Sequence, residues 1–340
     1  MILCAMIICL VAQAQYNTSK TNMCFPVRHM PWNYIPEQER QYCISCGFSR
    51  QVQPYFSPEE IPSLIDLEGW DLINNPSEAA LNITIDAFDF IIEGIHEDEY
   101  TNIVNDHGEK IAVKYYMPHI DYSIVINYSI ESNDGYNQKV TNIDPFTERP
   151  PMATFKIDQS FDNPMECHKY VMRNKEVFLE KIVRTEIMVV VEKIRDELKR
   201  RYVYYPTTDN IKISLFFSKK SDYYVKHQSA KTEIKKIIES MPLEGPLTET
   251  IKKIQPWIEH FKQLSESLSE SDKKQKQAKA DMIANLAMIY YALEIFDVSR
   301  DYANILINQY GETTLGRKIL RAISEVETNL TKHHLSSRHF

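Results

Sequence analysis

The first half of the chain alternates hydrophobic and polar residues with a period of two. Residues 81–86 read Leu-Asn-Ile-Thr-Ile-Asp, and residues 122–130 alternate in the same way with one break at Val125. This alternation predicts strands that have one face in a core and the other in water. Further strands are expected at 41–46, 110–116, 139–143 and 153–157. Turn residues between several of these runs indicate an antiparallel, β-sandwich-like domain.

After about Asn163 the apolar residues recur every three or four positions instead. The longest stripe, at positions 179, 183, 187, 190, 194 and 198, predicts a long helix. One strand at 211–217 should follow, and then a helix that Ser221 can cap and that buries apolar residues at 230–241, followed by helices over 247–268, 278–296, 298–309 and from 313 onward. We therefore predict an α+β protein with a β-rich domain (15–165), a mostly α-helical, tetratricopeptide-like domain (166–332) and a flexible tail (333–340).

Residues 1–14 are expected to be a signal peptide. An apolar run is followed by Ala12-Gln13-Ala14, the small-x-small triplet that precedes signal cleavage. The run is shorter than the ~20 residues that span a bilayer, and a buried N-terminal strand is the alternative. No Lys or Arg precedes it, which a start codon upstream of Met1 would explain. We expect an exported protein that is periplasmic, on the cell surface or secreted.

The composition of the chain argues against several classes of function. The chain has 340 residues with 39 Lys and Arg against 47 Asp and Glu, a net charge of -8. Nucleic-acid binding needs clustered positive charge, so neither a nucleic-acid partner nor stable membrane insertion is expected. The 8 glycines form no phosphate-binding loop, and no Gly-x-Ser-x-Gly or His-Glu-x-x-His motif occurs. We expect no catalytic residue, no cofactor and no metal site, although an enzyme assembled from scattered residues stays open.

Four cysteines remain beyond residue 14, and they are candidates for disulfides: Cys24, Cys43, Cys46 and Cys167. An even count in an exported chain permits such bridges. Cys43 and Cys46 have the spacing of a redox or zinc motif. They sit on an expected strand, however, where residues three apart point to opposite faces. Buried thiols or a structural bridge are therefore expected.

Three groups of polar residues have both a functional and a structural interpretation. The acidic stretch 89–99 could bind calcium, but it fits no EF-hand spacing and is expected to be a solvated loop. His119 and Asp121 could form an acid–base pair, but they are expected to lie at the start of a strand. The last histidines could bind metal, but a frayed tail explains them better: His333, His334 and His339.

One segment, residues 285–303, carries a recognisable order of leucine, small, tyrosine, leucine, aromatic and small residues. This order resembles a tetratricopeptide repeat. The resemblance implies that the following residues pack a helical hairpin: Leu286, Ala287, Tyr290, Phe296, Ser299 and Tyr302. Ser299 stands where the repeat usually has alanine, and no second copy lies 34 residues away. A generic helical hairpin is the alternative.

The chain as a whole resembles uncharacterised exported proteins of Bacteroidetes-type bacteria. The resemblance rests on the leader ending before Gln15, on Met-Pro-Trp-Asn-Tyr-Ile-Pro at 30–36, on Ile-Asp-Leu-Glu-Gly-Trp at 65–70, and on Asn-Leu-Ala at 285–287. It implies a β region followed by a tetratricopeptide-like helical region, and no activity. We expect a non-enzymatic binding or scaffold protein of the bacterial envelope, with a protein or peptide partner or else a glycan.

Two other functions stay open. A cell-wall or glycan hydrolase would use carboxylates on one β face, with Asp86, Asp89 and Glu93 as candidates. A carbohydrate-binding β module would expose a row of aromatic side chains, although core packing is expected for most of the candidates: Tyr115, Tyr116, Tyr122 and Tyr128.

Overall fold

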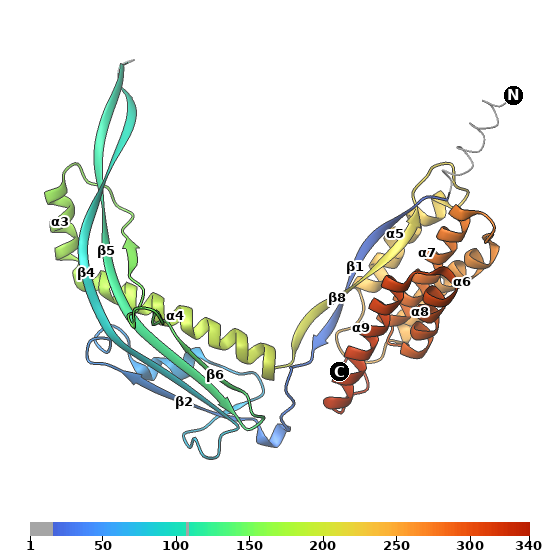
Figure 1. Cartoon of the computed structure of the whole chain (residues 1–340), viewed down its shortest axis with the longest axis horizontal. Coiled ribbons are helices and arrows are strands. Elements are labelled where there is room, and N and C mark those ends of the chain that lie inside the picture. Colours follow the sequence, from blue (N-terminus) through green and yellow to red (C-terminus); the bar gives the residue numbers. More distant parts are fainter. Residues whose placement is uncertain (1–15, 107–108) are drawn as a thin grey trace. The chain divides into compact units, whose positions relative to one another are not determined.

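A computed structural model describes residues 16–106 and 109–340, which form two compact units (Figure 1). Unit 1 contains the chain up to Tyr34 and Tyr204–Phe340, and unit 2 contains Ile35–Val203. The predicted mixed α and β class is confirmed. The units do not divide at the expected boundary of residue 165, because the first two long helices belong to the β-rich unit. The expected signal peptide lies outside the described residues.

Unit 2 is built on one sheet with strand order β3-β2-β4-β5-β6, and β7 also pairs with β5. Its strands are β2 (Gln41–Phe48), β3 (Asp71–Leu72), β4 (Leu81–Asp106), β5 (Glu109–Ser132), β6 (Asn137–Thr141) and β7 (Ala153–Lys156). Its helices are η1 (Glu37–Glu39), η2 (Pro58–Glu60), α2 (Ile61–Leu64), α3 (Pro164–Arg173) and α4 (Lys175–Tyr202). Strand β2 runs parallel to β3 and β4, so the sheet is mixed rather than purely antiparallel.

Helix α4 covers the apolar face of this sheet, where the sequence led us to expect a second sheet. The helix buries its predicted stripe, including Val183, Ile187 and Ile194. These side chains share one core with the alternating residues of β4, such as Ile83 and Ile85. Each fully buried side chain of this size contributes roughly 1.5–3 kcal/mol. The stripe alone is therefore enough to replace the second layer of a sandwich.

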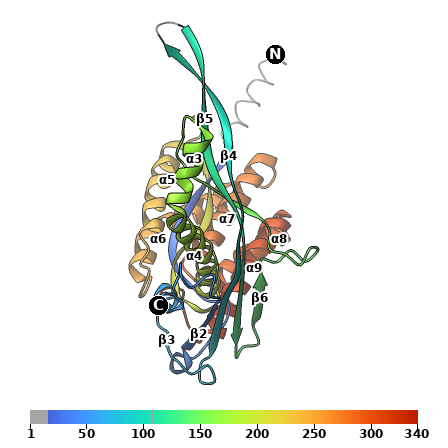
Figure 2. The ribbon, with the colours of Figure 1, turned by 90° about the vertical axis from the view of Figure 1, so that its left-hand side faces the viewer.

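Strands β4 and β5 form a long hairpin that continues past α3 as a two-stranded arm (Figures 1 and 2). The two predicted strands at 110–116 and 122–130 are parts of the single strand β5. The prediction of a solvated loop at 89–99 was wrong, because these residues pair along β5. The ladder shifts register near Asp89, whose φ of 51° marks an irregularity in the strand. The acidic side chains hid a strand because its apolar residues are few: Phe90 is buried and Ile92 and Ile95 pack against the core, while most of the acidic residues around them are exposed.

From Tyr16 onward, unit 1 combines a two-stranded antiparallel ribbon with five helices. The strands are β1 (Thr18–His29) and β8 (Tyr205–Phe216), and the helices are α5 (Tyr224–Glu239), α6 (Thr248–Ser267), α7 (Lys273–Ala292), α8 (Phe296–Tyr310) and α9 (Thr313–Lys332). Helices α5 and α7 pack against the ribbon, and α6 to α9 contact one another in sequence order. Gly311 ends α8 with a φ of 71°, as its position predicts. No helix among the described residues is long and apolar enough to cross a membrane.

The end of the chain is packed, so the prediction of a flexible tail at 333–340 was wrong. Arg338 is buried, and its carbonyl accepts a hydrogen bond from the N–H of Arg28 on β1 at 3.0 Å. Its guanidinium pairs with Glu294 at 2.7 Å and with Asp209 at 2.8 Å. This packing could not be predicted from the hydrophilic sequence of the tail, because the residues that pair with Arg338 lie far from it along the chain.

Candidate functional site

The outer edge of strand β8 lies beside a groove in unit 1. The N–H of Phe217 bonds to the carbonyl of Asn17 at 3.4 Å, so odd-numbered residues of β8 form the hydrogen-bonded pairs with β1. Even-numbered residues of β8 therefore point their backbone N–H and C=O groups away from β1. Among residues 16–106 and 109–340, β8 has β1 as its only strand neighbour. This edge can accept another partner.

Two buried helical side chains cover the end of this edge. Asn285 of α7 accepts a hydrogen bond from the N–H of Ser214 and donates one to its carbonyl, each at 2.7 Å. His227 of α5 accepts a hydrogen bond from the N–H of Phe216 at 3.0 Å. The Asn285 amide thus offers the donor and acceptor that a neighbouring strand would offer. The edge at 208–212 borders the groove instead, and no helical side chain in the described part of the chain covers it; the N–H of Asn210 donates to the neighbouring Asp209 carboxylate at 2.7 Å, a hydrogen bond that an added strand would replace.

The groove has a volume of about 350 Å³, within the range of roughly 300–1,000 Å³ typical of ligand sites. Its apolar lining comes from α7 and α9: Ala284, Met288, Tyr291, Leu315, Ile319 and Ala322. Three lysines also line it, Lys20, Lys212 and Lys318. The groove therefore combines an open backbone edge, an apolar surface and positive charge.

A buried polar network fixes one end of the groove. Asp209 lines it, and its carboxylate accepts hydrogen bonds from the Tyr291 hydroxyl at 2.6 Å and from Arg338 at 2.8 Å. Burial raises the pKa of Tyr291, so its hydroxyl stays protonated and donates. Arg338 shares its one positive charge between Asp209 and Glu294, so the three lysines of the groove outnumber the carboxylate that lines it, that of Asp209.

The hairpin formed by α7 and α8 lies in the same unit and contains the repeat-like residues. Leu286 and Ala287 are buried in the core. Ser299 donates a hydrogen bond to the carbonyl of Ala287 at 2.7 Å, and the rings of Tyr290 and Tyr302 stack with centroids 5.9 Å apart. Phe296 begins α8 and packs partly buried against the core. These contacts hold α7 in place beneath the groove.

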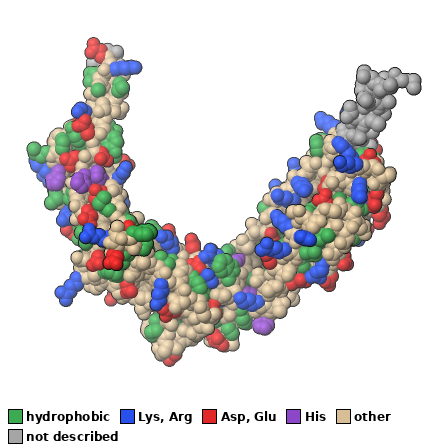
Figure 3. All heavy atoms as spheres, in the orientation of Figure 1, with side chains coloured by type: hydrophobic (Ala, Val, Ile, Leu, Met, Phe, Trp, Pro, Cys, Tyr) green, Lys and Arg blue, Asp and Glu red, His purple; other side chains and the backbone are tan. Residues whose placement is uncertain are grey.

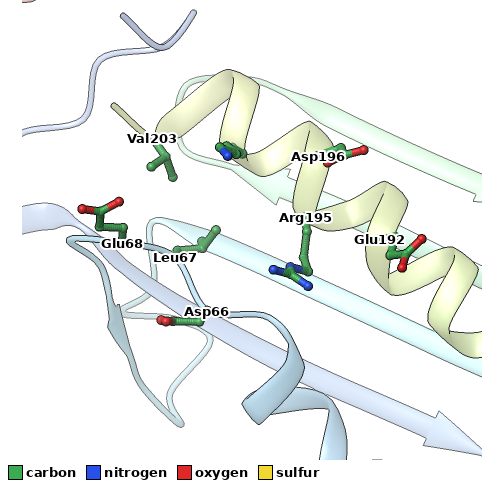
Figure 4. A pocket seen from close by; sticks show the side chains of 8 residues that line it. Asp66, Leu67, Glu68, Glu192, Arg195, Asp196 and Val203 are labelled. Atoms are coloured by element: carbon green, nitrogen blue, oxygen red, sulfur yellow. The ribbon is translucent and has the colours of Figure 1, made fainter. Parts of the chain in front are cut away.

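A second pocket, of about 500 Å³, lies in unit 2 between helix α4 and the segment before β3 (Figure 4). Asp66, Leu67 and Glu68 line it on one side. Helix α4 contributes four charged residues to the other side: Glu192, Arg195, Asp196 and Lys199. Figure 4 shows Arg195 extending from α4 toward the segment that carries Asp66. The pocket is lined by both acidic and basic side chains, so its charge does not favour either an anionic or a cationic ligand.

A cluster of histidines and aspartates lies where β7 pairs with β5, before the arm begins, and Figure 3 shows histidine side chains gathered on unit 2. His96 and His119 are direct cross-strand partners on β4 and β5, with ring centroids 5.4 Å apart. Asp121 Oδ2 lies 3.6 Å from His96 Nε2 and 3.9 Å from His119 Nε2. The expectation that His119 and Asp121 mark the start of a strand was wrong, because both lie inside β5. Sequence reasoning missed His96, which the expected loop at 89–99 concealed.

The four cysteines are free thiols. Cys43 and Cys46 both lie on β2, as predicted, and do not bridge. Burial, followed by the nearby carboxylate of Asp86, raises the pKa of Cys46 to about 11. A thiol that stays protonated is a poor nucleophile, and these contacts give Cys46 no redox activation. Cys24 is exposed and Cys167 is buried.

The other candidates from the sequence occupy separate places. Asp86 lines a shallow depression of about 320 Å³ on the sheet, whereas Glu93 accepts a hydrogen bond from Ser123 at 3.0 Å. The four tyrosines do not form an exposed row. Tyr122 and Tyr128 are buried in the core of unit 2, as expected. On the arm, the ring of Tyr115 stacks on Tyr100, and the hydroxyl of Tyr116 donates to Glu99.

The histidines near the end of the chain serve as packing and hydrogen-bonding groups. His333 contacts the hydroxyl of Tyr204 at 2.6 Å and the carbonyl of Pro31 at 2.8 Å. His339 contacts the carbonyl of Pro242 at 2.6 Å. The ring of His334 lies edge-on to Tyr34. These histidines help to fix the tail to unit 1.

Comparison with known proteins gives no family. No protein-family model and no curated protein matches this sequence. A minor lipoprotein from Acinetobacter baumannii is similar in structure at 6% identity, over 46% of this chain and 95% of that one, with a TM-score of 0.18. A putative neuraminyllactose-binding hemagglutinin homolog from Helicobacter pylori is similar at 12% identity, over 50% of this chain and 99% of that one, with a TM-score of 0.15. Neither similarity is strong enough to support an argument.

Proposed function

We propose that this is a non-enzymatic binding protein of the bacterial envelope, and that the groove of unit 1 takes an extended, acidic segment of a partner protein. The observation that carries the proposal is the open edge of β8 at 208–212 beside an apolar, lysine-lined groove. An extended peptide can add to such an edge through its backbone, while pockets select its side chains. The leader-like residues 1–14 support the envelope location.

The ligand class follows from the three parts of the groove. Backbone groups of β8 would pair with the peptide backbone, and the apolar residues of α7 and α9 would contact every second side chain. Lys20, Lys212 and Lys318 would attract carboxylates. A segment in which acidic and branched apolar residues alternate meets all three requirements. A neutral glycan would leave the lysines and the backbone edge largely unused.

The test is direct binding of a defined probe to the full chain. We expect a fluorescein-labelled hexapeptide of alternating glutamate and valine to bind, as measured by fluorescence anisotropy. The same peptide with lysine in place of glutamate should not bind. A version N-methylated at alternate residues keeps every side chain but cannot pair with a strand edge along that side. Equal binding of the N-methylated peptide would rule out strand addition, and displacement by maltohexaose would favour a glycan ligand.

Variants locate the binding to the groove. Ala322→Phe should fill it and weaken binding of the glutamate–valine peptide by at least about ten-fold, equal to about 1.4 kcal/mol. Lys318→Ala should weaken it by about two- to five-fold, the range of an exposed ion pair. Lys253→Ala, an exposed lysine on α6, is the matched control and should change nothing. If Ala322→Phe binds the peptide as well as the unmodified protein does, the groove is not the site.

A further inference from the structure

We propose that His96, His119 and Asp121, beside β7 in unit 2, form a binding site for a divalent transition-metal ion, for which zinc is the reference. The sequence led us to expect no metal, because the acidic stretch fits no calcium loop. The hairpin pairing changes this view, since it brings two imidazoles and a carboxylate to one face of two adjacent strands. Imidazole and carboxylate are common zinc ligands.

The distances between the donor atoms are close to those of a tetrahedral site. Bond lengths of about 2.0–2.2 Å place neighbouring ligand atoms about 3.4 Å apart. Asp121 Oδ2 lies 3.6 Å from His96 Nε2 and 3.9 Å from His119 Nε2. As these side chains stand, no group of three His, Cys, Asp or Glu residues in the described ranges could hold a metal ion, so the proposed site forms only if its side chains move. Both distances exceed 3.4 Å, so an ion would have to draw the ligands together, chiefly by a change of rotamer of the exposed His96 side chain.

One of the three ligands, Asp121, is held by a neighbouring group, and a carboxylate lies close to a second, His119. Asp98 Oδ2 lies 3.6 Å from His119 Nδ1, on the opposite side of the ring from the proposed metal ligand. Thr154 of β7 donates a hydrogen bond to Asp121 Oδ1 at 2.6 Å, which leaves Oδ2 for the ion. Outer carboxylate and hydroxyl partners of this kind are typical of metal-binding histidines and aspartates. His119 Nδ1 is buried and has no hydrogen-bond partner at present, so a small approach of Asp98 would satisfy it.

Gly94 provides the space for the third ligand. It is the cross-strand partner of Asp121, and a Cβ added at this position would lie 2.3 Å from His96 Nε2. A side chain at residue 94 would therefore displace the His96 ring from its place near Asp121. The His96 side chain is 57% exposed, against 16% for His119 and 15% for Asp121, which leaves an open approach for the ion. Three protein ligands would leave the fourth position to water.

The test uses the full chain and zinc chloride or cobalt chloride alone. We expect one equivalent of zinc to bind by isothermal titration, and cobalt to give the visible absorption of a tetrahedral site. His96→Gln, His119→Gln and Asp121→Asn should each abolish the cobalt spectrum and weaken zinc binding at least 100-fold. Asp98→Asn, which alters an outer group, should weaken zinc binding by about 10–100-fold.

The control is His168→Gln, which removes an exposed histidine of α3 in the same unit. It should bind zinc as the unmodified protein does. Gly94→Val should impair zinc binding without removing a ligand, and thermal unfolding of each variant would establish that it is folded. Zinc binding that survives in all three ligand variants, or absence of stoichiometric binding by the unmodified protein, would overturn the proposal. The groove in unit 1 would be unaffected by either outcome.

Discussion

Two buried histidines should make unit 1 sensitive to mild acid. His227 and His260 are buried, and their Nε2 atoms lie 3.1 Å apart. His227 Nδ1 accepts the N–H of Phe216, so His227 carries its proton on Nε2 and donates to His260. Burial lowers the pKa of His227 to about 3, with His260 and Lys226 as smaller causes. Burial, followed by Lys226, lowers the pKa of His260 to about 4.

The sign of the effect follows from these pKa values. Both folded-state pKa values lie below the value of about 6.5 expected for an unfolded histidine. Between pH 6.5 and 4 the unfolded chain therefore binds more protons, and the free energy of unfolding falls as the pH falls. From pH 7 to pH 5 each ring costs about 2 kcal/mol, and the pair about 4 kcal/mol. Most domains have only about 5–15 kcal/mol of stability in total.

His260→Gln isolates the contribution of one ring. The glutamine oxygen can take the place of Nε2 and accept the proton of His227, but it does not titrate. The loss of stability of unit 1 between pH 7 and pH 5 should shrink by about 2 kcal/mol. Burial also lowers the pKa of His339 in unit 1, but that contribution is present in both proteins and cancels.

The assay is urea unfolding at pH 7 and pH 5, followed by the fluorescence of Trp257, whose ring lies 6.0 Å from His260. Trp32→Phe and Trp70→Phe make Trp257 the sole reporter. Phe261→Leu is the matched control, because it disturbs the same core without removing a titrating group. It should lower stability equally at both pH values. If His260→Gln shows the same pH dependence as the unmodified protein, the two rings are not held neutral.

Three further predictions concern unit 1. Asn285→Ala leaves the N–H and C=O of Ser214 without their partner and should cost about 2–4 kcal/mol in urea unfolding, against little change for Gln228→Ala on the surface of α5. Deleting residues 333–340 leaves the buried carboxylate of Glu294 without Arg338 and should lower the free energy of unfolding of unit 1 by about 3–5 kcal/mol. The unfolding transition reported by Trp257 in unit 1 should shift, whereas that reported by Trp70 in unit 2 should not. Ser299→Ala removes one buried hydrogen bond and should cost about 1 kcal/mol by thermal unfolding, whereas a cost above 3 kcal/mol would contradict this account.

Periodicity predicted most of the elements but not their assembly. The stripe of α4 and the alternation at 81–86 are local patterns, and both were read correctly. Strand β1 buries Met23, Phe25 and Val27 in alternation, a signal that polar neighbours and Pro26 obscured. On the arm the strand at 110–116 was predicted, but its partner on β4 was missed, because neither face of the arm is buried and its residues therefore lack an apolar period. On such a hairpin, the face on which a side chain lies is set by the pairing register of the two strands, and no hydrophobic pattern in the sequence reveals it.

The candidate sites were less predictable because their residues are far apart in the sequence. The groove joins Lys20, Lys212 and Lys318, and no local pattern connects these positions. Asn285 was a usable signal, since it is a lone amide in an apolar helix that must find a buried partner. His96 could have been found only by treating 89–99 as a strand. In that case Gly94, His96 and Asp98 alternate onto one face.

The two segments of unit 1 also determine the order in which this protein can be completed during synthesis. Strand β1 emerges from the ribosome early, but its partner β8 follows only after the whole of unit 2 has been made. Unit 2 can therefore fold before β8 has been made. During that time the backbone groups of β1 have no partner strand, and such an unpaired strand is prone to aggregation. Arg338, which contacts both β1 and the groove network, comes later in the chain than β8. Unit 1 therefore depends on contacts between segments made before and after the whole of unit 2, whereas unit 2 is made from one continuous stretch.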